Sequence, residues 1–169
     1  MAEDHARPAL TIGRSAAGLV VFALAVAAAA LVGVFSALDS ADEYARLQQP
    51  AWAPPSWVFG PVWTVLYAMI ALAGWEVWRR LGWRGARSAL TLYTAQLVLN
   101  AAWTPLFFAA GLRAVAFAEI VVLWLVLTAT VVVFFGADRR AALLMVPYWV
   151  WTTFAAALNF AVWQLNAGG

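Results

Sequence analysis

The chain has 169 residues, of which 66% are hydrophobic and only 11% are charged. Soluble domains average about 45–50% apolar and about 25% charged residues, so this composition excludes a soluble or disordered domain. The net charge of +2 comes from ten Arg and eight acidic residues, and the Arg residues are spread over predicted turns, which excludes a nucleic-acid partner. Because Cys is absent and the single His lies in a polar tail, no metal site is expected.

Five segments are long and apolar enough to cross a membrane, which takes about 20 residues of helix. The first exceeds the roughly 7–15 apolar residues of a signal-peptide core and is followed by four more, so we expect it to be retained. The predicted spans are residues 15–38, 57–78, 88–110, 114–137 and 141–165. The sequence therefore predicts an all-α membrane protein, with one bundle of five transmembrane helices over residues 15–165 and polar tails at 1–14 and 166–169.

The connections between the spans predict the topology. Three of them, at residues 79–87, 111–113 and 138–140, are short, so sequential helices are expected to pack as antiparallel neighbours. Eight Arg residues lie on the side of the N-terminal tail and two on the opposite side. This bias predicts a cytoplasmic N-terminus and an external C-terminus, and it favours a bacterial inner membrane.

The first connection, residues 39–56, combines acidic residues with Pro50, Pro54 and Pro55. Because proline fixes φ and lacks a donor, we expect ordered extended or turn structure here, preceded by a short helix. Two interpretations are open. The loop is a lid over one end of the bundle, or it is a rim loop whose Trp52 and Trp57 lie in the interfacial aromatic belt.

Aromatic, small and amide side chains recur on three spans at a spacing of three and four residues, which places them on one face of each helix. Such a face must meet protein or a cavity, because an unpaired amide in hydrocarbon is costly. The three faces predict a central pocket, and the alternative is that the amides only hydrogen-bond one helix to another. Their members are Gly60, Trp63, Tyr67, Ala71, Gly74 and Trp78; Tyr93, Gln96, Asn100, Trp103, Thr104 and Phe107; and Tyr148, Trp151, Thr152, Ala155 and Asn159.

Two acidic residues lie within the predicted spans. Glu76 precedes Arg79 and Arg80 by three and four residues, the spacing of ion pairs on a helix surface, and we interpret it as structural. Glu119 lies one to two turns into the fourth span. Three interpretations are open: it is hydrated, it is paired with Arg113, or it marks a polar cavity.

Small residues and prolines are expected to shape the bundle. Alanines on the first span follow a small-residue pattern that allows helices to approach closely. Each proline near a span end is expected to break or bend its helix. The residues concerned are Ala23, Ala27, Ala30 and the pair Ala29 and Gly33 for close approach, and Pro61, Pro105 and Pro147 for breaking or bending.

Three motifs then carry a family resemblance. They are PAWAPPSWVF at residues 50–59 with PVWTVLY at 61–67, QLVLNAAWTPLFF at 96–108, and VPYWVW at 146–151 followed by Ala155, Leu158 and Asn159. In this order they resemble the TspO/MBR family, the tryptophan-rich sensory proteins of bacteria and the translocator proteins of mitochondria. The likeness covers residues 39–166.

The resemblance implies a five-helix bundle, often a homodimer, whose pocket beneath the first loop binds protoporphyrin IX, heme, or synthetic isoquinoline and benzodiazepine ligands. A flat macrocycle gains roughly 0.5–1.5 kcal/mol for each good aromatic pair beyond area burial. Such a porphyrin is a ligand, and no cofactor is required. The implied pocket residues are Trp52, Pro55, Trp63, Tyr67, Asn100, Trp103, Phe108, Tyr148, Trp151, Ala155 and Leu158.

The sequence departs from the family at two sites. The cholesterol motif of animal members has Tyr and Arg where this chain has Phe160 and Gln164, so sterol recognition is not implied. A Trp of animal members is replaced by Val115, whereas Glu119 stands where relatives also carry an acid. The resemblance also admits an outer-membrane location, since family members occur in outer membranes.

The leading functional interpretation is a membrane protein that binds tetrapyrroles and acts as a sensor or regulator of porphyrin level and stress response. One alternative is a transporter of porphyrins and other lipophilic ligands, although the sequence shows no inverted repeat. Another is an enzyme that degrades porphyrin with light and oxygen. Nucleophile, metal and phosphate-loop motifs are absent, and Trp63 and Trp151 are the redox candidates for such an enzyme.

Overall fold

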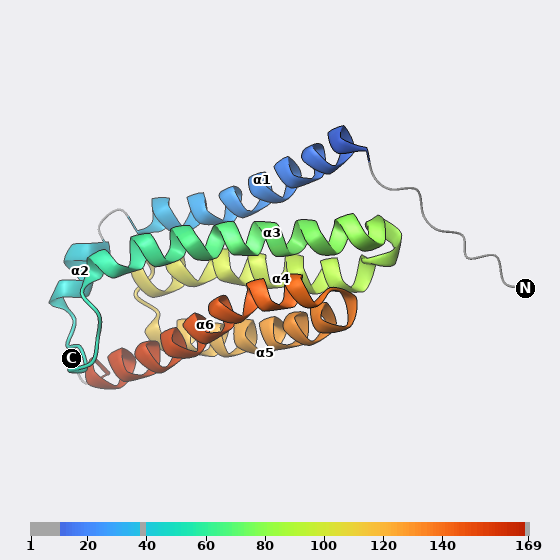
Figure 1. Cartoon of the computed structure of the whole chain (residues 1–169). Helices are drawn as coiled ribbons and strands as arrows, with labels where there is room; N and C mark the ends of the chain where they lie inside the picture. The colour runs from blue at the N-terminus through green and yellow to red at the C-terminus, as the bar shows by residue number, and fades with distance from the viewer. Residues whose placement is uncertain (1–10, 38–39, 168–169) are drawn as a thin grey trace, which may run out of the picture.

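The computed structural model describes residues 11–37 and 40–167, and all regular elements in this part of the chain are helical (Figure 1). The all-α prediction is thus confirmed. The elements are α1 (Ile12–Ser36), α2 (Ser40–Arg46), the 3-10 helix η1 (Ser56–Val58), α3 (Phe59–Gly85), α4 (Arg87–Thr104), the π-helix η2 (Pro105–Ala109), α5 (Arg113–Ala137) and α6 (Arg139–Leu165). The predicted tail up to residue 10, including His5, and the loop position Asp39 lie outside the described residues.

Four helices in the described ranges are long and apolar enough to cross a membrane: α1, η1 with α3, α5 and α6. They correspond to the first, second, fourth and fifth predicted spans. The third predicted span is divided between α4, which has 18 residues, and η2, which has five. Because α4 contains Gln96 and Asn100 among its apolar residues, its composition is more polar than that of the other four.

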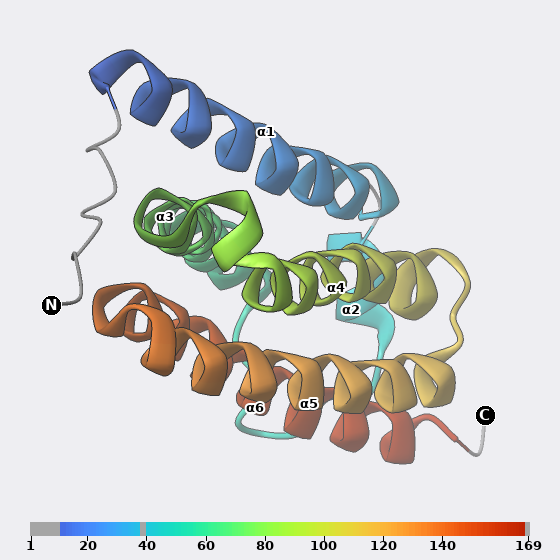
Figure 2. The ribbon, with the colours of Figure 1, turned by 90° about the vertical axis from the view of Figure 1, so that its right-hand side faces the viewer.

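The five long helices form a closed ring in the order α1, α3, α6, α5, α4 (Figure 2). Although α3 and α4 are joined by a short turn, they lie diagonally across this ring, where their backbones approach each other less than those of neighbouring pairs and side chains of α4 reach across to α3. The expectation that all sequential helices are packed neighbours is therefore wrong for this pair.

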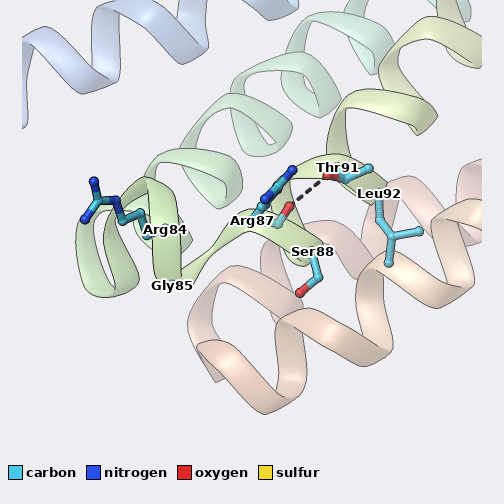
Figure 3. A pocket seen from close by; sticks show the side chains of 6 residues that line it. All are labelled: Arg84, Gly85, Arg87, Ser88, Thr91 and Leu92. Carbon is cyan, nitrogen blue, oxygen red and sulfur yellow. Dashed lines mark hydrogen bonds between the residues drawn. The ribbon is translucent and has the colours of Figure 1, made fainter.

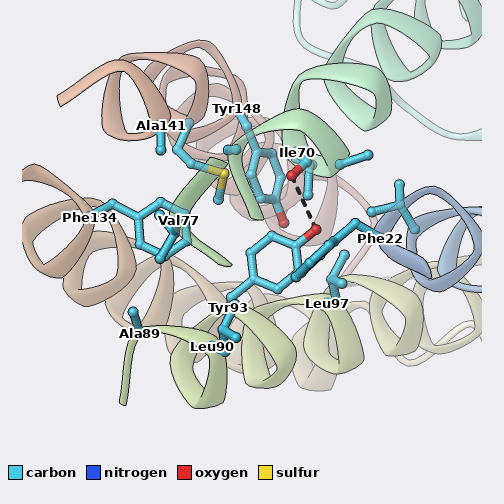
Figure 4. Packing of buried hydrophobic residues seen from close by; sticks show 14 of the residues in the cluster. Phe22, Ile70, Val77, Ala89, Leu90, Tyr93, Leu97, Phe134, Ala141 and Tyr148 are labelled. Atoms are coloured by element: carbon cyan, nitrogen blue, oxygen red, sulfur yellow. Dashed lines mark hydrogen bonds between the residues drawn. The ribbon is translucent and has the colours of Figure 1, made fainter. Parts of the chain in front are cut away.

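Tyr93 of α4 gives the physical reason, because its ring fills the space between these helices. Its hydroxyl donates to the carbonyl of Ile70 on α3 at 3.1 Å. Its ring stacks on Phe134 of α5 with centroids 6.2 Å apart and meets Phe22 of α1 edge-on at 5.7 Å (Figure 4). One aromatic side chain thus contacts three other helices of the ring.

Close approach of the helices depends on two glycines. A Cβ atom added to Gly18 would lie 2.0 Å from the Trp78 ring, and one added to Gly74 would lie 2.7 Å from Phe22. By contrast, Ala23 and Ala27 are exposed. Ala29 is buried, and a Cβ added to Gly33 would lie 3.6 Å from Thr104, so the small-residue pattern is confirmed for Ala29 and Gly33 and wrong for Ala23 and Ala27.

The prolines affect the helices differently from one another. Pro61 lies in the first turn of α3, where a missing N–H costs no helical bond. Pro105 begins η2, so the α-helix changes to a π-helix there. Pro147 lies inside α6, which continues to Leu165. Of the two predicted effects, a break at Pro147 does not occur, and a bend stays a prediction.

The turns joining α3 to α4 and α5 to α6 meet at one end of the ring. Glu76 pairs with Arg79 at 2.7 Å, as predicted, whereas Arg80 reaches across to Asp138 at 3.0 Å. Burial acts to raise the pKa of Asp138, but hydrogen bonds from the Ala141 amide, Arg80 and the Arg140 amide outweigh it and lower that pKa. Asp138 therefore stays ionised, caps α6 and joins the two turns.

We expect Gly18→Ala to lower the stability of the bundle by about 1–3 kcal/mol, because the new methyl group overlaps the Trp78 ring. Thermal unfolding in detergent, followed by circular dichroism, measures the change. The matched control is Gly136→Ala, whose added Cβ would have no neighbour within 4 Å. Equal melting temperatures for the two variants would contradict the close α1–α3 contact.

Candidate ligand-binding site

Asn100 joins three helices by hydrogen bonds near the middle of the ring. Its side-chain oxygen accepts from the hydroxyl of Tyr67 on α3 at 3.0 Å, and its nitrogen donates to the hydroxyl of Tyr148 on α6 at 3.0 Å. Asn100 is 6% exposed and Tyr148 is fully buried. The amide predicted to face a pocket or another helix therefore does bond helices together, and it places two phenol groups on either side of itself.

Trp63 completes an aromatic group around this bridge. Its ring stacks on Tyr67 at 5.1 Å, with an angle of 29° between the planes, and meets Tyr148 edge-on at 6.0 Å. Trp63 and Tyr67 lie one turn apart on α3, so helical spacing positions both rings on the face that meets α6. Three of the predicted site residues are thus in direct contact.

A second aromatic group surrounds Trp103 at the end of α4. The indole N–H of Trp103 donates to Asn159 of α6 at 3.0 Å, and Asn159 in turn donates to the carbonyl of Arg113 at 3.0 Å. The π-helix η2 brings Phe107 and Phe108 against the Trp103 ring, at 4.9 Å and 6.1 Å. Leu158 packs in the same cluster.

Trp151 connects these groups to the first loop. Its ring contacts Phe59 at 5.8 Å and Phe154 at 5.4 Å, and Phe154 contacts Trp52 at 5.7 Å. Phe59 and Phe154 were missed by the sequence analysis, although Phe154 lies three residues after Trp151. The remaining predicted site residues are Pro55, exposed at the start of η1, and Ala155, half-buried on α6.

The first loop is tied to the ring at two points. Glu43 of α2 pairs with Arg113 at 3.1 Å, and Asn166 after α6 exchanges two hydrogen bonds with the backbone of Gln48, at 3.1 and 2.9 Å. The Tyr44 hydroxyl donates to the carbonyl of Pro54 at 3.3 Å, and burial raises the pKa of Tyr44. The short helix predicted before the prolines is α2. The opposite charges of Glu43 and Arg113, on the same predicted side, were the available signal for the ion pair.

Glu119, Gln96 and the indole N–H of Trp78 have no hydrogen-bond partner among the described residues. The Glu119 carboxylate oxygens are buried, and Arg113 pairs with Glu43, so of the three alternatives for Glu119 the pair with Arg113 does not form. Gln96 is fully buried, and both its amide nitrogen and its oxygen are unpartnered. These groups mark polar positions in an otherwise apolar interior.

An open pocket of about 490 Å³ lies at the opposite end of the ring, beside the turn between α3 and α4 (Figure 3). At the predicted site beneath the first loop, by contrast, the aromatic side chains pack against one another. The pocket there stays a prediction, and a ligand would reach it by separating these rings.

The apolar helical ring defines an integral membrane protein. A sequence model of the TspO/MBR family matches residues 20–164, and the chain belongs to this family. The tryptophan-rich sensory protein of Cereibacter sphaeroides is 41% identical over 147 residues, which cover 86% of this chain and 91% of the relative. The translocator protein of Homo sapiens is 40% identical over 127 residues, which cover 74% of this chain and 75% of the relative. The tryptophan-rich protein TspO of Archaeoglobus fulgidus is 37% identical over 150 residues, which cover 88% of this chain and 97% of the relative.

We expect Asn100→Leu to destabilise the bundle by about 1–3 kcal/mol, because two buried hydroxyls lose their partner. Tyr67→Phe removes only one of these bonds and is expected to cost less. Urea unfolding in mild detergent compares the variants. A smaller loss for Asn100→Leu than for Tyr67→Phe would contradict the bridging role of Asn100.

Proposed function

We propose that this protein binds tetrapyrroles such as protoporphyrin IX or heme within a bundle of five transmembrane helices and acts as a sensor or regulator of porphyrin level. Besides the four apolar helices, the third predicted span would also cross the membrane. It consists of α4, with 18 residues, continued by η2, with five. A length of 23 residues suffices for a membrane of ordinary thickness.

The observation that carries this proposal is the Asn100 bridge with aromatic rings on both sides of it. Ligand pockets of this class combine apolar and aromatic surfaces with a few oriented polar groups. Trp63 and Tyr148 supply surfaces for a flat macrocycle, and the Tyr67–Asn100–Tyr148 chain supplies hydroxyl and amide groups. These groups suit the faces and edges of a porphyrin without requiring a metal ligand.

The segment from α2 to η1 would act as the lid of this site. It covers the end of the ring where Trp52, Phe154 and Trp151 form a continuous row of rings. Its polar attachments are at Arg113 and Asn166, and beside them the buried Tyr44 meets Phe59 edge-on at 5.5 Å. Opening them would free Trp52 to move away from Phe154 and admit a ligand.

The distribution of arginines supports an N-terminus in the cytoplasm of a bacterium and an inner-membrane location. Arg80 and Asp138 bring together the two turns that the sequence assigns to the cytoplasmic side. The Ser15 carbonyl accepts from Trp75 at 2.9 Å, so the start of α1 lies at the same end. We further propose a homodimer as the assembly in the bilayer.

A second candidate function is light-dependent degradation of the bound porphyrin. The contact of Trp63 with Tyr67 and Tyr148 favours it, because three oxidisable rings would lie together beside the ligand. Transport of lipophilic ligands, in line with the name of the translocator relatives, is a further alternative.

Trp63→Phe and Trp151→Phe are expected to weaken binding of protoporphyrin IX by roughly 0.5–1.5 kcal/mol each, the range for one aromatic pair. Titration followed by porphyrin absorbance measures this. Illumination in air then tests degradation, since Phe is hard to oxidise and bleaching would fall much more than binding does. Trp149→Phe is the control, because Trp149 faces α5 and donates to Thr128 at 2.9 Å. If all three variants match the wild type in both assays, the site assignment fails.

Glu43→Gln is expected to raise hydrogen exchange in residues 42–55 by about fivefold or more, since an exposed ion pair is worth about 0–1 kcal/mol and the Glu43–Arg113 pair is half-buried. Added protoporphyrin IX should slow exchange in this segment. The control is Glu76→Gln, which removes the Glu76–Arg79 pair at the far end of the bundle. Unchanged exchange with and without porphyrin would argue for an interfacial rim loop in place of a lid.

A further inference from the structure

We propose that the open pocket at the α3–α4 turn binds the phosphate headgroup of an anionic phospholipid. This proposal is independent of the tetrapyrrole site, which lies at the other end of the ring. The pocket has a volume of about 490 Å³ and is lined by Arg84, Gly85, Arg87, Ser88, Thr91 and Leu92 (Figure 3).

The two arginines of the pocket are the free cations of this turn. Arg79 and Arg80 are neutralised by Glu76 and Asp138. Arg84 and Arg87 are exposed, and neither forms an ion pair with any carboxylate in the described ranges. A guanidinium group binds phosphate through several N–H donors in a fixed plane. The pocket therefore has an unneutralised positive charge facing the membrane–water interface.

The backbone explains why both arginines reach one pocket. Gly82 has φ of 67°, in the left-handed region, and interrupts the helical path of α3 shortly before its end. The following turn brings Arg84 and Gly85 beside Arg87 and Ser88 at the start of α4. The Thr91 hydroxyl donates to the Arg87 carbonyl at 2.9 Å. The Ser88 side chain points to the other side of the turn from the Arg87 guanidinium (Figure 3), so the donors for an anion are those of the two arginines.

The surroundings favour a lipid over a soluble phosphate. Leu92 contributes an apolar wall to the pocket, and Val98, further along α4, is 63% exposed. Trp83 in the same turn is 58% exposed, as expected for a side chain at the headgroup level. A phosphate held by Arg84 and Arg87 would thus let its acyl chains lie along the apolar surface of α4. Basic pockets at the cytoplasmic ends of membrane helices bind acidic headgroups in this way.

The test compares spin-labelled phosphatidylglycerol with spin-labelled phosphatidylcholine for the full chain in phosphatidylcholine vesicles, using electron paramagnetic resonance of the motionally restricted lipid. We expect the wild type to prefer phosphatidylglycerol. In the double variant Arg84→Gln/Arg87→Gln, the ratio of bound phosphatidylglycerol to bound phosphatidylcholine should fall about fivefold for each charge removed. The control Arg139→Gln/Arg140→Gln removes the same charge from two exposed arginines of the neighbouring turn that do not line the pocket.

Thermal unfolding of both double variants verifies that they fold as the wild type does. An equal loss of preference in the two variants would assign the effect to surface charge in general and overturn the pocket. Unchanged preference in the pocket variant would overturn it as well. Inorganic phosphate is added in a final arm. Displacement of phosphatidylglycerol by an equal concentration of phosphate would assign the pocket to a soluble anion instead of a lipid.

Discussion

A polar side chain inside an apolar bundle is costly unless it finds a partner within the protein, and at the centre of this structure Asn100 is the buried amide that finds two, whereas Gln96 stays unpartnered within the described part of the chain. Lipid chains are as apolar as leucine, so helices in a membrane gain little by hiding apolar surface from them. Asn100 meets this constraint by bonding Tyr67 and Tyr148 at once, which ties together α3, α4 and α6. The relative rotation of three helices is thereby set by one amide.

Glycine and aromatic side chains then complete the packing around that centre. Gly74 of α3 lets Phe22 and Tyr93 approach that helix, and Gly18 of α1 lets Trp78 of α3 approach α1. Because Tyr93 occupies the middle of the ring, α3 and α4 are held apart and α1 closes the gap between them. The site end depends on rings that contact one another rather than on a rigid cavity, whereas the arginine end has an open pocket. The two ends of the bundle are therefore built for different kinds of partner.

Much of this architecture could be predicted from local sequence, but the partners of individual side chains could not. Helix positions follow from apolar length, and the inward faces of Asn100 and Tyr148 follow from a spacing of three and four residues. The Glu76–Arg79 pair was predictable because both residues lie on one helix. For the Glu43–Arg113 pair the sequence offered only opposite charges on one predicted side, and neither this pair nor Arg80–Asp138 could be singled out, since each joins residues far apart in the chain. Their formation depends on ring order and helix register, which the periodicity of a single helix does not contain.

The proline inside α6 has a mechanical consequence for the residues that follow it. Pro147 has no amide hydrogen, so the carbonyl of Leu143, one turn earlier, lacks its usual helical donor. The backbone is therefore easiest to bend immediately before Tyr148, Trp151 and Leu158. A bend at this point would move these side chains together, because they follow one another on one helix, while the Asp138 cap holds the start of α6.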